Sequence, residues 1–238
     1  MSAYSFNASC SLSWPMSGFT LDWYVKLSQN EQLITAAWNS LYVAACATAL
    51  TLIIGVPAAM ALDQIHFPGK GILRKFILLP IALSGIITDI SMLTMFRLFG
   101  VNLSLETVIV GHAKALLAVV VTQVFARLQR LPKSYSEASN GLGASGLQTF
   151  FLVTLPNIRS AVIGAGLLSF TLSFDEIPVT FFLTGRGNTL PMYIWSTLRR
   201  GLTPEINAVG ALIVAASAIL ILVSVLLLRD DVNAHQWA

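Results

Sequence analysis

The chain has 238 residues, of which 55% are hydrophobic and only 11% are charged, and its mean hydropathy is +0.75. Because soluble domains usually contain about 25% charged residues, this composition excludes a soluble globular domain and predicts an all-α integral membrane protein, a bundle of membrane-spanning helices. The basic residues behind the net charge of +3 are spread between apolar stretches, which argues against a nucleic-acid-binding face.

Residues 1–32 are polar and aromatic, and they contain no apolar run long enough for a signal peptide or a membrane span. Aromatic side chains such as Trp14, Trp23 and Tyr24 suit the interface between membrane and water. We therefore expect residues 1–32 to form an N-terminal segment outside the apolar core of the membrane.

Five apolar stretches follow, each near the ~20 residues that a span requires. Their approximate bounds are 35–62, 76–98, 106–126, 158–183 and 207–228. With their loops they make one transmembrane domain over residues 33–230, which leaves a short tail at residues 231–238.

The basic residues between the spans predict the orientation of the chain. Eight of them lie on one side, which the positive-inside rule makes cytoplasmic, and four lie on the other. The N-terminal segment is then extracytoplasmic, whereas the tail and residues 134–156 are cytoplasmic. The first set is Lys70, Arg74, Lys75, Arg127, Arg130, Lys133, Arg159 and Arg229, and the second is Lys26, Arg186, Arg199 and Arg200.

Residues 134–156 form a polar, glycine-rich stretch between the third and fourth predicted spans. Two possible capping boxes mark helix starts there, Ser134 with Glu137 and Ser145 with Gln148. Three glycines follow the first box, at positions 141, 143 and 146, and they permit the positive φ of a tight turn. The pattern predicts a short helix, a turn and a second short helix that stops before Pro156.

The order of residues in this stretch is Glu-Ala-Ser, three residues, Gly, nine residues, Val, one residue, Leu-Pro. It resembles the Glu-Ala-Ala loop of permease subunits in binding-protein-dependent ABC importers, with Ser139 and Val153 as small departures. The resemblance implies that the loop, at about 132–157, docks on a separate ATPase. A plain cytoplasmic hairpin in which Glu137 only caps a helix is the alternative. The implied coupling residues are Glu137, Ala138, Ser139, Gly143, Ala144, Ser145, Leu155 and Pro156.

The resemblance extends from Ser5 to about Arg229 and is to permeases of the spermidine/putrescine type. The stretches Ser-Phe-Asn at residues 5–7 and Phe-Thr-Leu-Asp-Trp-Tyr at residues 19–24 look like the segment after the first span of that family. The family usually has six spans. We therefore expect a further span upstream, lost through a start codon assigned too far downstream, or else a five-span variant.

Three carboxylates fall within predicted spans, where ionisable groups are costly and face protein or water. Asp89 and the pair Asp175 and Glu176 lie in the half of the membrane away from the loop. Two structural alternatives stay open: an ion pair of Asp89 with a cation such as Arg97, and a polar network around a kink at Pro178.

The segment Ser-Phe-Thr-Leu-Ser-Phe-Asp-Glu at residues 169–176 resembles an acidic segment of polyamine-type permeases. The resemblance implies a translocation path in which carboxylates and aromatic rings replace the hydration of a cationic amine. The residues assigned to this path are Asp175, Glu176, Asp89, Phe170 and Phe174. His112 and Lys114 lie nearby in the sequence of the third span and receive no functional role, since lone residues of this kind usually snorkel or cap.

The outer loop after the fourth span carries Arg186, and Arg199 and Arg200 follow an aromatic anchor at Trp195. One interpretation is an interfacial loop. The other is a contact with an extracytoplasmic binding protein, whose acidic groups would meet these arginines. The two interpretations are compatible.

No glycine-rich phosphate-binding loop occurs in the sequence, so we expect no enzymatic activity and no cofactor in this chain, with ATP and Mg²⁺ bound by the partner ATPase. The resemblance implies an inner-membrane permease for spermidine, putrescine or a related amine, with an ATPase dimer, a second permease subunit and a soluble binding protein as partners. Another substrate, such as an opine, an amino acid derivative or an aminophosphonate, is the alternative. An ion-coupled secondary transporter or a membrane scaffold explains less of the sequence.

Overall fold

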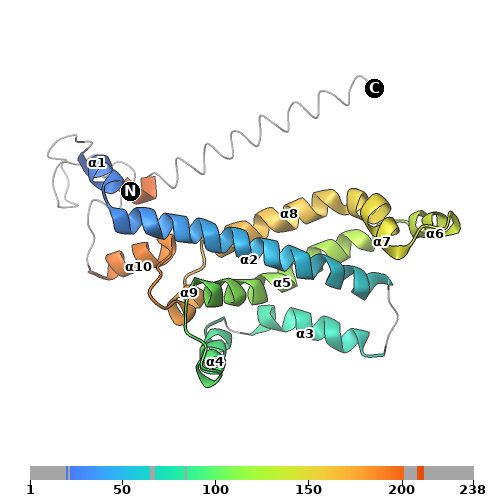
Figure 1. The fold of residues 1–238 in the computed structure, drawn as a ribbon, viewed down its shortest axis with the longest axis horizontal. Helices are drawn as coiled ribbons and strands as arrows, with labels where there is room; N and C mark the ends of the chain where they lie inside the picture. The colour runs from blue at the N-terminus through green and yellow to red at the C-terminus, as the bar shows by residue number, and fades with distance from the viewer. Residues whose placement is uncertain (1–19, 21, 65–67, 84, 201–207, 212–238) are drawn as a thin grey trace. The chain divides into compact units, whose positions relative to one another are not determined.

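The computed structural model describes residues 20, 22–64, 68–83, 85–200 and 208–211. All regular structure in these ranges is helical, which confirms the predicted all-α class (Figure 1). The elements are α1 (Asp22–Ser28), α2 (Glu31–Gln64), α3 (Lys70–Ala82), α4 (Gly85–Leu98), α5 (Leu105–Leu128), α6 (Ser134–Gly141), α7 (Gly146–Thr149), η2 (Phe150–Thr154), α8 (Leu155–Phe174), α9 (Pro178–Leu183) and α10 (Leu190–Arg200).

Three helical segments of the described chain are long and apolar enough to cross a membrane, namely 31–64, 105–128 and 146–174. The fifth predicted span, at 207–228, and the tail lie almost wholly outside the described residues, as does most of the N-terminal segment. The chain divides into two compact units. The larger, Ala36–Met192, contains both the loop at 132–157 and the carboxylates Asp89, Asp175 and Glu176. In the other unit, the Asn30 side-chain amide donates a hydrogen bond of 3.0 Å to the Tyr193 hydroxyl.

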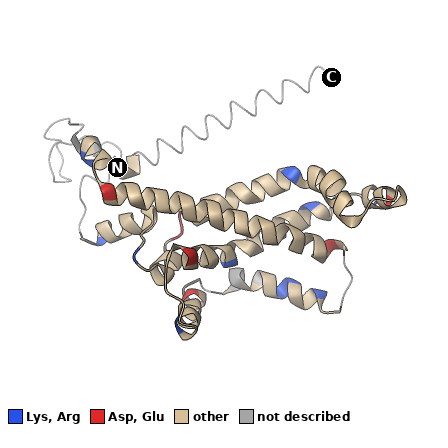
Figure 2. Cartoon of the chain, in the orientation of Figure 1, with Lys and Arg blue, Asp and Glu red and all other residues tan. Residues whose placement is uncertain are grey.

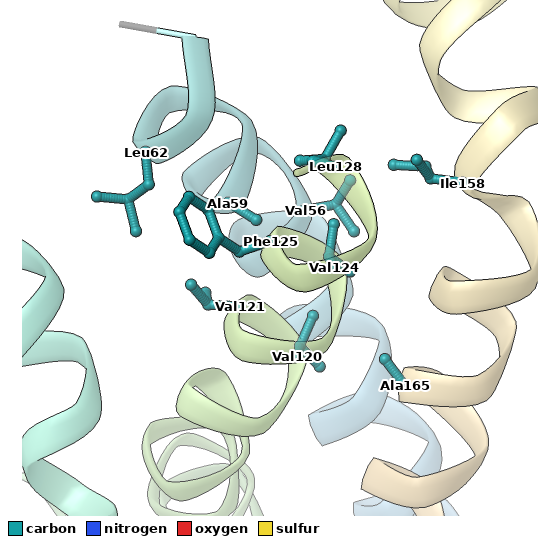
Figure 3. Packing of buried hydrophobic residues seen from close by; sticks show 10 residues of the cluster. All are labelled: Val56, Ala59, Leu62, Val120, Val121, Val124, Phe125, Leu128, Ile158 and Ala165. Atoms are coloured by element: carbon teal, nitrogen blue, oxygen red, sulfur yellow. The ribbon is translucent and has the colours of Figure 1, made fainter. Parts of the chain in front are cut away.

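The core of the larger unit lies where α2, α5 and α8 meet (Figure 3). Close approach there depends on small residues. A Cβ on Gly55 would lie 2.8 Å from Val120 Cγ1, and one on Gly166 would lie 3.2 Å from Leu52 Cδ1. The buried cluster consists of Val56, Ala59, Leu62, Val120, Val121, Val124, Phe125, Leu128, Ile158 and Ala165.

The predicted span at 76–98 is not one helix. Helix α3 ends at Ala82, where Leu83 takes an extended conformation, and α4 begins at Gly85. The two pieces have different partners, because α3 packs against α5 whereas α4 packs against α9. The sequence is apolar on both sides of the break, so its composition alone did not show that one predicted span is two helices with different packing partners.

The predicted span at 158–183 is also interrupted, between Phe174 and Pro178. Proline has no N–H to continue the hydrogen-bond ladder, and it occupies the first position of α9, where none is needed. The kink considered for Pro178 is therefore a complete break that leaves residues 175–177 between two helices.

The loop after α9 packs tightly against the start of α5. Thr107 Oγ1 donates to the carbonyl oxygen of Leu183 at 2.8 Å, and Gly185 lies against the backbone of Leu103. A Cβ on Gly185 would lie 2.1 Å from the carbonyl oxygen of Leu103, which is a backbone atom with little freedom to move. The loop therefore has room only for glycine at this position.

We expect Gly185→Ala to destabilise the protein by about 1–3 kcal/mol, the usual cost of overpacking. Thermal melting of the detergent-solubilised transporter measures the effect. Gly71→Ala is the matched control, because Gly71 is exposed on α3 and a Cβ there meets nothing within 4 Å. Equal melting temperatures for the two variants would contradict the packing described for Gly185.

Candidate functional site

The predicted turn in the loop at 132–157 is present, and it depends on Gly143. This residue has φ of 82° and follows the end of α6. Its N–H bonds the carbonyl of Asn140 at 2.9 Å, and the N–H of Ala144 bonds the carbonyl of Ser139 at 3.2 Å, as in a Schellman motif. Gly141 and Gly146 lie within α6 and α7 and have no positive φ.

One of the two predicted capping boxes forms. Ser145 N donates to Gln148 Oε1 at 2.8 Å, and Gln148 N donates to Ser145 Oγ at 3.4 Å. The box at Ser134 is wrong, because α6 has Lys133 as its N-cap and Ser134 is already helical. The carbonyl of Lys133 accepts a hydrogen bond from the N–H of Glu137 at 3.1 Å. The helix therefore starts at Ser134, whereas a capping box would make Ser134 the N-cap and start the helix one residue later.

The second short helix does not stop before Pro156, which corrects another prediction. Helix α7 continues through one turn of π-helix, η2, directly into α8. The wider turn bonds Leu155 N to the Phe150 carbonyl and so accommodates the missing N–H of the proline. The Asn157 side-chain amide donates to the Val153 carbonyl at 2.7 Å, supplying a further bond there.

The hairpin of α6 and α7 presents a mixed polar and apolar surface. Glu137 and Ala138 are exposed on α6, and Leu142 and Leu147 beside them are 89% and 73% exposed. Sequence reasoning missed these leucines, although two apolar residues in an otherwise polar turn are a detectable signal. Gly143, Ser145 and Pro156 are also exposed, and Ala144 is half-buried.

Ser139 and Leu155 face the protein interior instead. Ser139 Oγ and Thr149 Oγ1 are buried 2.9 Å apart, which joins α6 to α7. Leu155 packs against the core cluster of α2, α5 and α8. These two residues can therefore shape and anchor the hairpin but do not form its outer surface.

We expect Gly143→Ala to loosen the hairpin by about 1–2 kcal/mol, because an L side chain is strained at positive φ. Amide hydrogen exchange of residues 138–149 should accelerate about 5–30-fold. Gly146→Ala is the control, since no atom lies within 4 Å of its Cβ position and its φ is not positive. Unchanged exchange in Gly143→Ala would contradict the Schellman turn.

Lys and Arg residues gather at the same end of the larger unit as the hairpin. Figure 2 shows basic residues at the beginning of α3, at the end of α5 and near the beginning of α8. The break between α8 and α9 lies far from this end, beyond the twenty residues of α8.

The break carries Asp175 and Glu176. Asp175 is exposed, whereas Glu176 is half-buried and its Oε1 accepts a bond of 3.5 Å from Val179 N. The rings of Phe170 and Phe174 stack on the preceding turn of α8, with centroids 6.1 Å apart. The predicted acids and aromatic rings of this segment are therefore adjacent.

His112, which received no role from the sequence, connects both sides of the break to α5. Its Nδ1 lies 2.7 Å from Ser173 Oγ on α8, and its Nε2 lies 3.4 Å from Thr180 Oγ1 on α9. The ring is buried and borders a cavity of about 130 Å³ that Ser173 and Glu176 also line. A single side chain thus helps to position the acidic segment, through contacts that only the packed fold reveals.

Asp89 is buried on α4, and its partner is Lys114 of α5, not Arg97. Lys114 Nζ lies 3.0 Å from Asp89 Oδ1. Arg97 is eight residues further along α4, about 12 Å along the helix axis. The predicted ion pair of Asp89 is therefore present, but its cation is Lys114, a residue that received no role from the sequence.

The three arginines assigned to a binding-protein contact fall in different units. Arg186 is exposed after α9 in the larger unit. Arg199 lies in the smaller unit with its guanidinium carbon 5.3 Å from the centroid of the Trp195 ring. Arg200 ends α10, and its side chain is outside the described part of the structure.

Comparison with known proteins identifies a family, two similar permeases and a solved structure of the same fold. Residues 52–230 match the family described as "Binding-protein-dependent transport system inner membrane component". The chain is 35% identical over 224 residues to the putrescine transport system permease protein PotI of Escherichia coli K12, covering 91% of this chain and 79% of PotI. It is 33% identical over 233 residues to the spermidine/putrescine permease PotC of the same strain, covering 97% and 88%.

A solved structure shows the same fold. It is a bacterial ABC transporter involved in import of the acidic polysaccharide alginate, and it superposes with a TM-score of 0.73 over 95% of this chain and 86% of that one. The sequence identity is only 17%, so this likeness concerns the fold alone.

Proposed function

The chain belongs to the family of binding-protein-dependent transport system inner membrane components, and we propose from this premise that it imports putrescine, spermidine or a related amine-bearing solute. Members of this family are non-catalytic, multi-pass permease subunits of ABC importers, which work with an ATPase and a substrate-binding protein. The proposal concerns the solute, the orientation and the residues that serve each step.

The observation that carries the choice of solute is the acidic segment between α8 and α9. Asp175 is exposed, Glu176 borders a cavity, and two stacked phenyl rings precede them. An alkylammonium group that leaves water needs carboxylates and aromatic faces to replace its hydration. Asp89 belongs to the same path but is occupied by Lys114 in this conformation.

The hairpin of α6 and α7 is the proposed docking element for the ATPase. The basic residues around it support a cytoplasmic location by the positive-inside rule. Glu137 and Ala138 would contact the ATPase together with the exposed leucines Leu142 and Leu147. Because η2 joins the hairpin to α8 without interruption, movement of the docked hairpin would tilt α8 and alter access to the acidic segment.

Two further partners complete the proposal. Large apolar side chains on α8, including Ile163, Leu167 and Leu172, are exposed in the single chain and suit a contact with a second permease subunit. Arg186, Arg199 and Arg200 would meet acidic groups of the substrate-binding protein.

Competition for uptake tests the choice of solute. Labelled putrescine is taken up by proteoliposomes that contain the assembled transporter, and unlabelled compounds are added in excess. We expect spermidine to compete and 1,4-butanediol, which has hydroxyl groups in place of ammonium groups, to leave uptake unchanged. Equal competition by the diol would contradict recognition of ammonium groups.

A further inference from the structure

The ion pair of Asp89 and Lys114 differs from a typical structural salt bridge, because only one of the two carboxylate oxygens accepts a hydrogen bond. Lys114 Nζ lies 3.0 Å from Asp89 Oδ1 and 3.0 Å from Thr88 Oγ1. The second oxygen, Asp89 Oδ2, is buried and has no hydrogen-bond partner among the described residues. A buried ion pair stabilises a protein only when its remaining lone pairs are satisfied. This carboxylate therefore keeps unused capacity to accept hydrogen bonds.

The two partners also differ in their access to the surroundings. The Asp89 side chain is 2% exposed, whereas that of Lys114 is 27% exposed. Lysine carries a compact ammonium with three donors on a flexible stem. Its head can leave and return while the carboxylate stays fixed in α4.

Lys114 lies within α5, a helix long and apolar enough to cross a membrane, and Asp89 lies against it. Lys114 is nine residues from the start of α5, which is about 14 Å along the helix. Charges at such depth are costly and usually serve a transport path. A fixed carboxylate with no counter-ion there would be unfavourable whenever the path is empty.

Among the described residues of this region, carboxylates outnumber ammonium groups. Two further carboxylates, Asp175 and Glu176, lie at the break between α8 and α9, and Glu176 lines a cavity with His112, which is two residues before Lys114 on α5. Together with Asp89 and Lys114, these groups comprise three carboxylates and one ammonium. A solute that carries ammonium groups would supply the missing positive charge.

We propose that Lys114 is a tethered ammonium that occupies the Asp89 carboxylate when no solute is present, and that a primary ammonium group of the solute displaces it. This inference rests on the proposed import of an amine-bearing solute. Lysine ends in the same primary alkylammonium group as a diamine, so the exchange preserves both charge and donor number at Asp89. Because one ammonium replaces another, the charge of Asp89 stays balanced during the exchange. The exchange therefore favours transport of solutes with primary amines.

Chemical rescue tests whether Asp89 accepts an external ammonium. Lys114→Ala removes the tethered group and leaves space for a small amine. We expect propylammonium chloride to raise the melting temperature of the assembled Lys114→Ala transporter, and tetramethylammonium chloride, which has no N–H donor, to have no such effect at equal ionic strength. The control is the double variant Asp89→Asn/Lys114→Ala, which should respond to neither salt. If Lys114→Ala responds to neither salt, or equally to both, the inference is wrong.

Lys114→Arg provides a second test that does not depend on assembly of the alanine variant. Its planar guanidinium retains the charge and can reach both carboxylate oxygens. We expect an unchanged or higher melting temperature and a putrescine uptake rate lowered on the order of tenfold, because the guanidinium leaves the carboxylate less readily. Uptake at the wild-type rate would overturn displacement. If the wild-type transporter takes up no polyamine, the proposed solute is wrong, while propylammonium rescue still decides the role of Lys114.

Discussion

Replacement of Glu137 by lysine is expected to abolish ATP-driven uptake and to release the ATPase from the membrane complex. Glu137 is exposed in the first turn of α6, where a carboxylate is favoured by the helix dipole. Reversal of its charge replaces attraction by repulsion at the proposed contact, which costs several kcal/mol. The affinity of the ATPase should fall by more than about a hundredfold.

Co-purification of the ATPase with the tagged permease measures this loss directly. Glu31→Lys is the matched control, because Glu31 is also an exposed glutamate in the first turn of a helix, α2, but lies outside the hairpin. It should retain the ATPase. If the Glu137→Lys complex keeps its ATPase and transports at the wild-type rate, Glu137 serves only as a helix-capping charge.

Neutralisation of Asp175 is expected to lower uptake of putrescine about tenfold at solute concentrations below saturation. The change to asparagine keeps the shape of the side chain and removes one charge-assisted hydrogen bond to the solute, worth about 1.5–3 kcal/mol. Because Asp175 is exposed at the end of α8, the fold should tolerate the change. Assembly and ATP hydrolysis should therefore stay at wild-type levels.

Initial rates of uptake at several putrescine concentrations distinguish weaker recognition from a damaged transporter. Asp63→Asn is the control, since Asp63 lies near the end of α2 on the side of the hairpin and outside the proposed path. It should transport as the wild type does. If Asp175→Asn takes up putrescine at the wild-type rate, Asp175 does not line the path. Glu176 would then be the only acid proposed for the path at the break between α8 and α9.

Local features of the hairpin were predictable because they depend on neighbours in sequence. The spacing from Ser145 to Gln148 defines a capping box, and Gly143 supplies the positive φ of the turn. Pro156 misled the prediction, since proline usually ends a helix. The π-turn before it removes the conflict, and no simple sequence pattern announces such a turn.

Contacts between helices were not predictable in the same way. Asp89 and Lys114 are 25 residues apart on different helices, and their pairing depends on how α4 sits against α5. Arg97 was the nearer cation in sequence, but it shares helix α4 with Asp89 and lies eight residues further along it. The hydrogen bonds of His112 to Ser173 and Thr180 likewise require three packed helices.

The measurement that tests the proposed function most directly is ATP-dependent uptake of labelled putrescine and spermidine into proteoliposomes. These contain the chain with its second permease and ATPase, and the substrate-binding protein is added on the side of the outer loop. Uptake that requires ATP and the binding protein, and that disappears in Glu137→Lys, is the expected result. A complex that assembles and hydrolyses ATP but takes up neither polyamine would contradict import of these amines.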